Sequence, residues 1–236
     1  MNGKIDVVIT DDHKLFRKGI AALLSDFEFV GEINEAGNGV ELLNLLDHME
    51  NAPDVILLDL SMPVMDGIEA QEKIRSLYPE IKIIILSMED DEHVVLHLIE
   101  EGVNGYLLKN ADPDEMEFAL KKVTSQGFYF SSQLSEFIVR NAVQKKTNKF
   151  DARELFSEKE LRILELICTQ YTAAEIGDEL NLSVRTIEGY RRKLLEKTNS
   201  KNLAGLVVFA LKNNLVTIEN RRKLWSELPL QLIICI

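Results

Sequence analysis

Cysteine is scarce in this sequence, and long apolar runs are missing. Only two cysteines, Cys168 and Cys235, occur among the 236 residues, which argues against a disulfide framework and fits a reducing cytoplasm. No stretch reaches the roughly 18 uncharged apolar residues of a membrane span. The first residues also lack the apolar core of a secretory signal. We therefore expect a cytoplasmic protein without a membrane partner.

Histidine is equally sparse. His13, His48, His93 and His97 are scattered, and no group of cysteines and histidines has the spacing of a zinc site. We assign none of these histidines a chemical role.

Positive charge is scarce in the first half of the chain. The net charge is -12, but it is uneven: residues 1–130 carry 10 Lys and Arg against 26 Asp and Glu, whereas residues 131–236 carry 17 against 13. An acidic front and a mildly basic back suggest two domains with different partners. The alternative is solvated surface charge that happens to be asymmetric.

Short apolar runs alternate with segments of helical period over the first 125 residues. The runs are rich in Val, Ile and Leu and mostly unbroken, as in strands that are buried on both faces. In the first helical segment, Leu15, Phe16, Gly19, Ile20, Leu23 and Leu24 are expected on one buried face. The predicted strands are 5–10, 27–33, 54–58, 82–86 and 105–108. The helical segments that follow are 38–49, 66–77, 91–101 and 113–125. Five such repeats predict a parallel, doubly wound α/β sheet.

The rest of the chain has a different character. Residues 126–154 are polar and predict a linker, helical near 131–143. Residues 155–216 predict an all-α unit of about four helices, two of which open on capping boxes, Ser157 with Glu160 and Thr172 with Glu175. Residues 217–236 form a tail of unknown role.

Polar side chains follow several of the predicted strands. Asp59 follows the third strand, and Asp11 and Asp12 follow the first, which is its neighbour in a 2-1-3-4-5 order. Three converging carboxylates attract a cation, and Mg²⁺ prefers such oxygen ligands. Ser87 and Lys109 follow the fourth and fifth strands, so the set could hold a phosphoryl group. Singly, each residue could instead cap a helix or lie in a turn.

Four segments, VVITDDHKLFRKG, VILLDLSMPVMDGIE, IILSMEDDEH and GVNGYLLKNADPDEM, resemble the receiver domain of two-component response regulators. The resemblance covers residues 1–125 and implies a flavodoxin-like fold with Asp59 as phosphoacceptor. It implies that Asp59 and the Ser61 carbonyl are ligands of Mg²⁺, that Asp12 binds the ion directly, and that Asp11 acts through water or from outside the direct ligands. It also implies that Ser87 and Lys109 contact the phosphoryl group and that Tyr106 is the switch aromatic. The phosphoryl donor is then expected to be a separate molecule, a sensor histidine kinase.

A short break separates two helical segments in TAAEIGDELNLSVRTIEGYRRKLLEKT. The first helix is expected to end near Leu180 and the second to begin near Ser183, which is the spacing of a helix-turn-helix. The outer face of the second helix is expected to carry basic residues that suit a DNA major groove. Many helix pairs with a charged face do not bind DNA, so the spacing alone leaves both possibilities open. The residues expected on this face are Arg185, Glu188, Arg191, Arg192, Lys193 and Lys197.

Almost all of residues 156–202 resembles the LuxR-type helix-turn-helix of the NarL/FixJ response regulators, which place it after a receiver. The resemblance implies that Glu188, Gly189 and Arg192 face base edges of double-stranded DNA. The residues implied to lie near phosphates are Arg185, Thr186, Tyr190, Arg191 and Lys197.

The expected function is therefore a DNA-binding transcriptional response regulator that is not an enzyme and forms a homodimer on phosphorylation. Two alternatives belong to other classes. A phosphatase of the haloacid dehalogenase type usually has Asp-x-Asp at its nucleophile, but here Asp59 is followed by Leu60 and Ser61. The second alternative is a receiver whose output is protein–protein interaction, with a degenerate helix-turn-helix.

Overall fold

The computed structural model describes residues 3–88, 92–131, 134, 152–213 and 215–216. The chain folds as two compact units, Met1–Ser131 and Ser132–Ile236. Most of the predicted helix at 131–143 and the whole tail at 217–236 lie outside the described residues.

The first unit contains one five-stranded parallel sheet with the order β2-β1-β3-β4-β5, as the sequence predicted. Its strands are β1 (Ile5–Thr10), β2 (Val30–Ala36), β3 (Val55–Asp59), β4 (Lys82–Ser87) and β5 (Gly105–Leu108). Its helices are α1 (Lys14–Ser25), α2 (Gly39–His48), α3 (Gly67–Leu77), α4 (Glu92–Glu100) and α5 (Pro113–Gln126).

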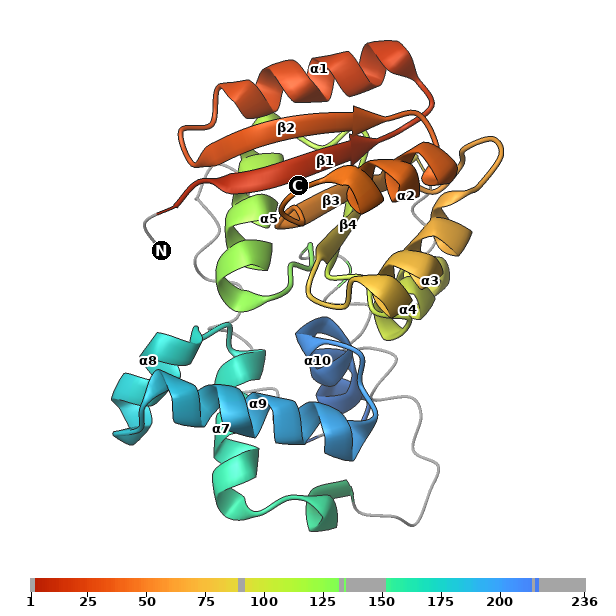
Figure 1. The fold of residues 1–236 in the computed structure, drawn as a ribbon. Coiled ribbons are helices and arrows are strands. Elements are labelled where there is room, and N and C mark those ends of the chain that lie inside the picture. The colour runs from red at the N-terminus through yellow and green to blue at the C-terminus, as the bar shows by residue number, and fades with distance from the viewer. Residues whose placement is uncertain (1–2, 89–91, 132–133, 135–151, 214, 217–236) are drawn as a thin grey trace, which may run out of the picture. The chain divides into compact units, whose positions relative to one another are not determined.

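Helices cover both faces of this sheet (Figure 1). Alternate residues of the central strands, such as Val7, Ile9, Val55 and Leu57, join one apolar cluster with α1 and α5. Helices α2, α3 and α4 lie on the opposite face. Because both faces are covered, the central strands read as unbroken apolar runs.

Two details of the first unit differ from the prediction. Strand β2 begins three residues after the predicted start, because the segment before it forms a turn in which the Val30 N–H donates to the Phe27 carbonyl at 2.9 Å. Leu15 is 88% exposed, so its predicted place on the buried face of α1 is wrong. The buried side of α1 instead follows Phe16, Ile20 and Leu24, at the spacing of one helical face.

The first unit also continues past residue 125, where the linker was predicted to begin. Phe128, Tyr129 and Phe130 are buried, and Tyr129 forms a parallel bridge with Gly105 of β5. The phenol of Tyr129 donates a hydrogen bond to Glu115 of α5. This segment therefore packs as part of the α/β unit.

The described part of the second unit is helical. It contains a 3₁₀ turn η1 (Ala152–Leu155) and helices α7 (Glu158–Cys168), α8 (Ala173–Leu180), α9 (Val184–Thr198) and α10 (Leu203–Lys212). Both predicted capping boxes are present, at Ser157 with Glu160 and at Thr172 with Glu175. Among the residues that the structure describes, no helix combines the length and apolarity needed to cross a membrane.

Candidate functional site

The carboxylates that follow β1 and β3 lie together at the carboxyl edge of the sheet. Ligand atoms from Asp11, Asp12, His13 and Asp59 all lie within 4.8 Å of one another. The parallel pairing of β1 with β3 produces this convergence, since both strands end at the same edge. Carboxylate oxygens are ligands that Mg²⁺ prefers, so this donor set fits that ion.

Lys109 joins two of these carboxylates. Its Nζ lies 2.7 Å from Oδ2 of Asp11 and 2.9 Å from Oδ2 of Asp59. Lys109 follows the last residue of β5, and its backbone N–H donates to the carbonyl of Ser87 in β4 at 2.8 Å. This hydrogen bond fixes the backbone from which the lysine side chain extends. One lysine, with its side chain 10% exposed, therefore lies between two buried carboxylates.

The surroundings shift the pKa values of this pair. Asp59 is only 3% exposed, and this burial raises its pKa, although Lys109 opposes the effect. Burial by itself would lower the pKa of Lys109, but hydrogen bonds to Asp11 and Asp59 outweigh it and raise the value. A carboxyl group with its cation already in place is suited to accept an electrophile whose negative charge needs neutralising.

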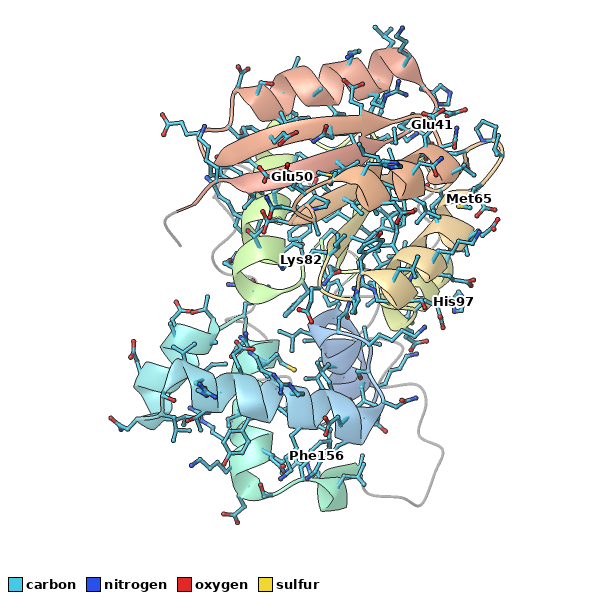
Figure 2. All side chains as sticks on the ribbon, in the orientation of Figure 1. Glu41, Glu50, Met65, Lys82, His97 and Phe156 are labelled. Atoms are coloured by element: carbon cyan, nitrogen blue, oxygen red, sulfur yellow. The ribbon has the colours of Figure 1, made fainter. Side chains whose placement is uncertain are left out.

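The loop between β3 and α3 brings the chain close to Asp59. The N–H of Gly67 donates to the carbonyl of Leu60 at 2.9 Å. A Cβ atom at Gly67 would lie 2.1 Å from the Asp59 carbonyl, so no larger residue fits there. Asp66 caps α3 by accepting a hydrogen bond from the Glu69 N–H. The labelled Met65 marks this loop in Figure 2.

The remaining predicted residues of this unit lie close to that edge. Ser87 is the buried last residue of β4, and Tyr106 is buried in the neighbouring β5, where it is the register partner of Ile85. Ser61 lies two residues beyond Asp59 and donates its backbone N–H to the Asp59 carboxylate. The roles assigned to them stay predictions.

The second unit forms the helix-turn-helix that its sequence predicts. Asn181 takes a left-handed conformation at φ 54° after α8, and the Ser183 side chain caps α9 by accepting from the Thr186 N–H. Helices α8 and α9 pack against each other, and Ile176 of α8 and Ile187 and Leu194 of α9 are fully buried.

The predicted DNA-contacting residues fall into two groups. The exposed ones are Arg185, Thr186, Glu188, Gly189, Arg192 and Lys197, with Tyr190 partly exposed, and the buried one is Arg191. In the described part of the chain, neither Arg185 nor Arg192 has an ion-pair partner. These two guanidinium groups are therefore available to an anionic ligand.

Arg191 was predicted on the outer face of α9, and this placement is wrong. It is 8% exposed, and its guanidinium contacts Glu188 at 2.9 Å and the Tyr171 carbonyl at 3.4 Å. Position 191 falls on the side of α9 that carries Ile187 and Leu194, because residues three and four apart share a helix face.

Lys197 is held by a neighbouring helix. Its Nζ lies 2.7 Å from Oε2 of Glu160, and it donates to the Leu155 carbonyl at 2.9 Å. Lys193 approaches the other oxygen of Glu160 at 2.9 Å. Phe156, labelled in Figure 2, lies with its ring centroid 5.7 Å from Lys197 Nζ.

Sequence reasoning missed the second role of Glu160. It was identified only as a capping-box residue, yet it also binds two lysines from a helix more than 30 residues away along the chain. The one available signal was the i, i+4 spacing of Lys193 and Lys197, which places both on one side of α9. That spacing indicates a shared partner but does not identify it.

Two family models match the chain. One, described as the response regulator receiver domain, matches residues 7–121. The other, described as the luxR family of bacterial regulatory proteins, matches residues 154–210. Each match falls within one of the two compact units.

Named relatives match along most of their length. The chain is 31% identical over 232 residues to the transcriptional regulatory protein DegU of Brevibacillus brevis, covering 91% of this chain and 96% of DegU. It is 36% identical over 215 residues to the oxygen regulatory protein NreC of Staphylococcus aureus, covering 89% and 98%. A structure of RcsB from Salmonella enterica serovar Typhimurium, bound to promoter rprA in the presence of phosphomimetic BeF3-, has 27% identity and a TM-score of 0.51. That similarity covers 82% of this chain and 92% of the RcsB chain.

Proposed function

Because the chain belongs to the NarL/FixJ type of LuxR-family two-component response regulators, we propose that phosphorylation of Asp59 switches its activity in transcription. Members join a receiver domain to a DNA-binding helix-turn-helix. The observation that carries the proposal is the position of Lys109 between the buried carboxylates of Asp11 and Asp59. This arrangement supports a carboxylate nucleophile at Asp59 rather than a merely structural charge.

The proposed step is a phosphoryl transfer to a carboxylate. A carboxylate oxygen of Asp59 attacks the phosphorus of a phosphohistidine on a sensor histidine kinase, the P–N bond breaks, and the imidazole leaves. A small acyl phosphate would serve as donor with its carboxylate as leaving group. Lys109 is positioned to pair with the new phosphoryl oxygens, and the Ser87 hydroxyl to hydrogen-bond them.

The carboxylates of Asp11, Asp12 and Asp59, called the acidic group below, are proposed to hold Mg²⁺ together with the Ser61 carbonyl. When bound, the ion would neutralise charge on the phosphoryl oxygens. Its support is the convergence of the carboxylates, whose mutual repulsion a divalent cation relieves.

The conformational response is proposed to pass through the two edge strands. Ser87 and Tyr106 lie on adjacent strands, where Ser87 pairs with Leu108 and Ile85 pairs with Tyr106. Phosphorylation adds nearly two negative charges beside these strands. A shift of Ser87 toward the phosphoryl group would change the packing around the buried Tyr106, which biases a two-state element.

DNA binding is proposed to depend on the exposed residues of α9. RcsB is a relative whose structure contains promoter DNA, and Arg185 and Arg192 are the exposed arginines of α9 in this chain. A homodimer formed on phosphorylation would place two such helices on half-sites roughly 34–36 Å apart. A cytoplasmic location is consistent with this role.

Intact mass tests the receiver chemistry. The full chain is incubated with acetyl phosphate and Mg²⁺, and we expect one hydroxylamine-sensitive phosphoryl adduct. Asp59→Asn should take no adduct. Asp54→Asn is the matched control, because Asp54 precedes the same strand at its other end. An adduct that persists in Asp59→Asn would contradict the assignment.

Selection from genomic fragments tests the output, using the phosphorylated full chain. With the selected duplex, Arg192→Ala should lose about 1–3 kcal/mol of binding free energy. Arg162→Ala is the control, because that exposed arginine is already paired with Glu165 and Glu179. If no duplex is selected, the protein-interaction alternative replaces this proposal.

A further inference from the structure

Asp11 is held at every polar atom. Its N–H donates to the Ala36 carbonyl at 3.2 Å, and its two carboxylate oxygens contact the His13 N–H at 2.7 Å and Lys109 Nζ at 2.7 Å. The fourth contact comes from α1, where Nη1 of Arg17 donates to the Asp11 carbonyl at 2.5 Å. The direction of the chain as it leaves Asp11 toward Asp12 is therefore fixed partly by a side chain outside the acidic group.

Arg17 is itself fixed by Glu35 of β2. Its Nε donates to Oε2 of Glu35 at 2.9 Å, and the two side chains are only 14% and 21% exposed. The backbone of Glu35 is fixed within the sheet, because Glu35 is the register partner of Ile9 in β1. Lys18 binds the second oxygen of Glu35 at 2.6 Å.

These contacts require an arginine. A guanidinium presents several N–H donors in a fixed plane, so Nε can bind a carboxylate while Nη1 binds a carbonyl. Lysine has one nitrogen on a flexible stem and cannot span both acceptors in this geometry. Arg17 thus connects the edge strand β2 to the turn between β1 and α1.

Asp12 depends on that turn for its position. Its carboxylate is partly exposed and contacts Nδ1 of His13, at 2.7 Å. The backbone between Asp11 and His13 therefore decides where this carboxylate lies relative to Asp59. The Arg17 contact acts on the first residue of that backbone segment.

We propose that Arg17, oriented by Glu35, is a positioning residue that holds the Asp11–Asp12 turn in the arrangement that binds a divalent cation. This inference rests on the proposed function, because it concerns the same acidic group. Arg17 and Glu35 are not among the residues proposed to hold the phosphoryl group or the ion. Their effect is on the orientation of the carboxylates.

Charge and orientation predict opposite results. A cation near a metal site weakens metal binding by repulsion, so removal of Arg17 would tighten Mg²⁺ binding if its charge were its main effect. Loss of an orienting contact weakens metal binding, typically by tenfold or more. The sign of the change in Mg²⁺ affinity therefore distinguishes the two.

The experiment is a Mg²⁺ titration of the full chain. Binding is monitored through the NMR chemical shifts of backbone amides in the β1–α1 turn. Arg17→Gln and Arg17→Lys should each weaken binding about tenfold. Lys18→Gln is the matched control. The substitution removes a cation that binds the same Glu35, but Lys18 is not one of the groups that contact Asp11. The Mg²⁺ affinity of this variant should therefore stay within about twofold of the wild-type value. The Mg²⁺ concentration for half-maximal labelling by acetyl phosphate should rise by the same factor in the Arg17 variants.

Unchanged or tighter Mg²⁺ binding in folded Arg17→Gln would overturn the inference. If that variant does not fold, Glu35→Gln supplies the second test, with an expected weakening of about threefold because the amide oxygen still accepts from Nε. Unchanged affinity there would also overturn it. If the wild-type protein binds Mg²⁺ and accepts a phosphoryl group, and the Arg17 variants do so equally well, only this inference is refuted. If the wild-type protein neither binds Mg²⁺ nor accepts a phosphoryl group, the proposed function is refuted as well.

Discussion

Each unit places one charge between two opposite charges, and the signs are reversed in the two units. In the receiver, Lys109 lies between Asp11 and Asp59. In the helical unit, Glu160 lies between Lys193 and Lys197. The first arrangement keeps excess negative charge at the edge of a sheet, where a metal ion and a phosphoryl group can approach. The second is closed, since Glu160 also completes a capping box, and it fixes one helix against another.

The largest effect is expected from removing the central charge of the receiver. Lys109→Met leaves two buried carboxylates facing each other, and breaking such a buried pair typically costs roughly 3–5 kcal/mol. Hydrogen exchange of β3 and β4 amides in the full chain measures the loss. Added Mg²⁺ should restore part of it, because the ion supplies replacement charge. A loss below about 1 kcal/mol without Mg²⁺ would remove the contrast between the two groups.

An intermediate effect is expected from Glu160→Gln. A glutamine still completes a capping box, so the change isolates the interaction with the two lysines. Hydrogen bonds to charged groups contribute about 1.5–3 kcal/mol, and we expect a loss in that range from hydrogen exchange of α7 and α9 amides.

Glu175→Gln is the matched control for this change. Glu175 completes the equivalent capping box at Thr172, and its substitution should alter stability by about 1 kcal/mol or less. Equal losses for the two glutamates would mean that the lysines add nothing to the position of α9.

The stability provided by Glu160 should depend on pH in a defined direction. Burial tends to raise its pKa, but hydrogen bonds from Lys197, Ser157 and Lys193 lower it from 4.5 to about 2. The folded unit therefore binds a proton at Glu160 more weakly than the unfolded chain does. The stabilisation is complete at pH values above the ordinary glutamate pKa of 4.5, and it declines as the pH falls toward 2. The stability difference between wild type and Glu160→Gln, followed against pH, should shrink over that interval. A difference that grows on acidification would contradict the assigned ion pairs.

The smallest effects are expected from two helical glycines, Gly177 of α8 and Gly189 of α9. A Cβ at Gly177 would lie 2.7 Å from the Leu182 carbonyl oxygen, whereas one at Gly189 meets nothing within 4 Å. Gly189→Ala should therefore stabilise the unit by about 0.8–1 kcal/mol through helix propensity. Gly177→Ala should lose stability despite the same gain, because the turn must move. Thermal unfolding of both variants provides the check, and equal stabilisation would show that the turn yields freely.

Much of the fold and the acidic group could be predicted because the relevant signals are local. Unbroken apolar runs predicted the parallel sheet, and Asp11, Asp12, Asp59 and Lys109 stand directly after such runs. Once the strand order is known, their convergence follows from geometry. The capping boxes at Ser157 and Thr172 likewise depend on residues three apart.

The sequence by itself therefore determined the fold class, the family and the residues at the strand ends. Only the tertiary structure decided that Leu15 faces outward, that Arg191 is buried, and that Glu160 holds Lys197. It alone also revealed the contact of Arg17 with the Asp11 carbonyl. The physical reason is that helical period and capping act within a few residues. The partner of a charged side chain depends on which elements pack together, and a charge can bind any opposite charge within reach.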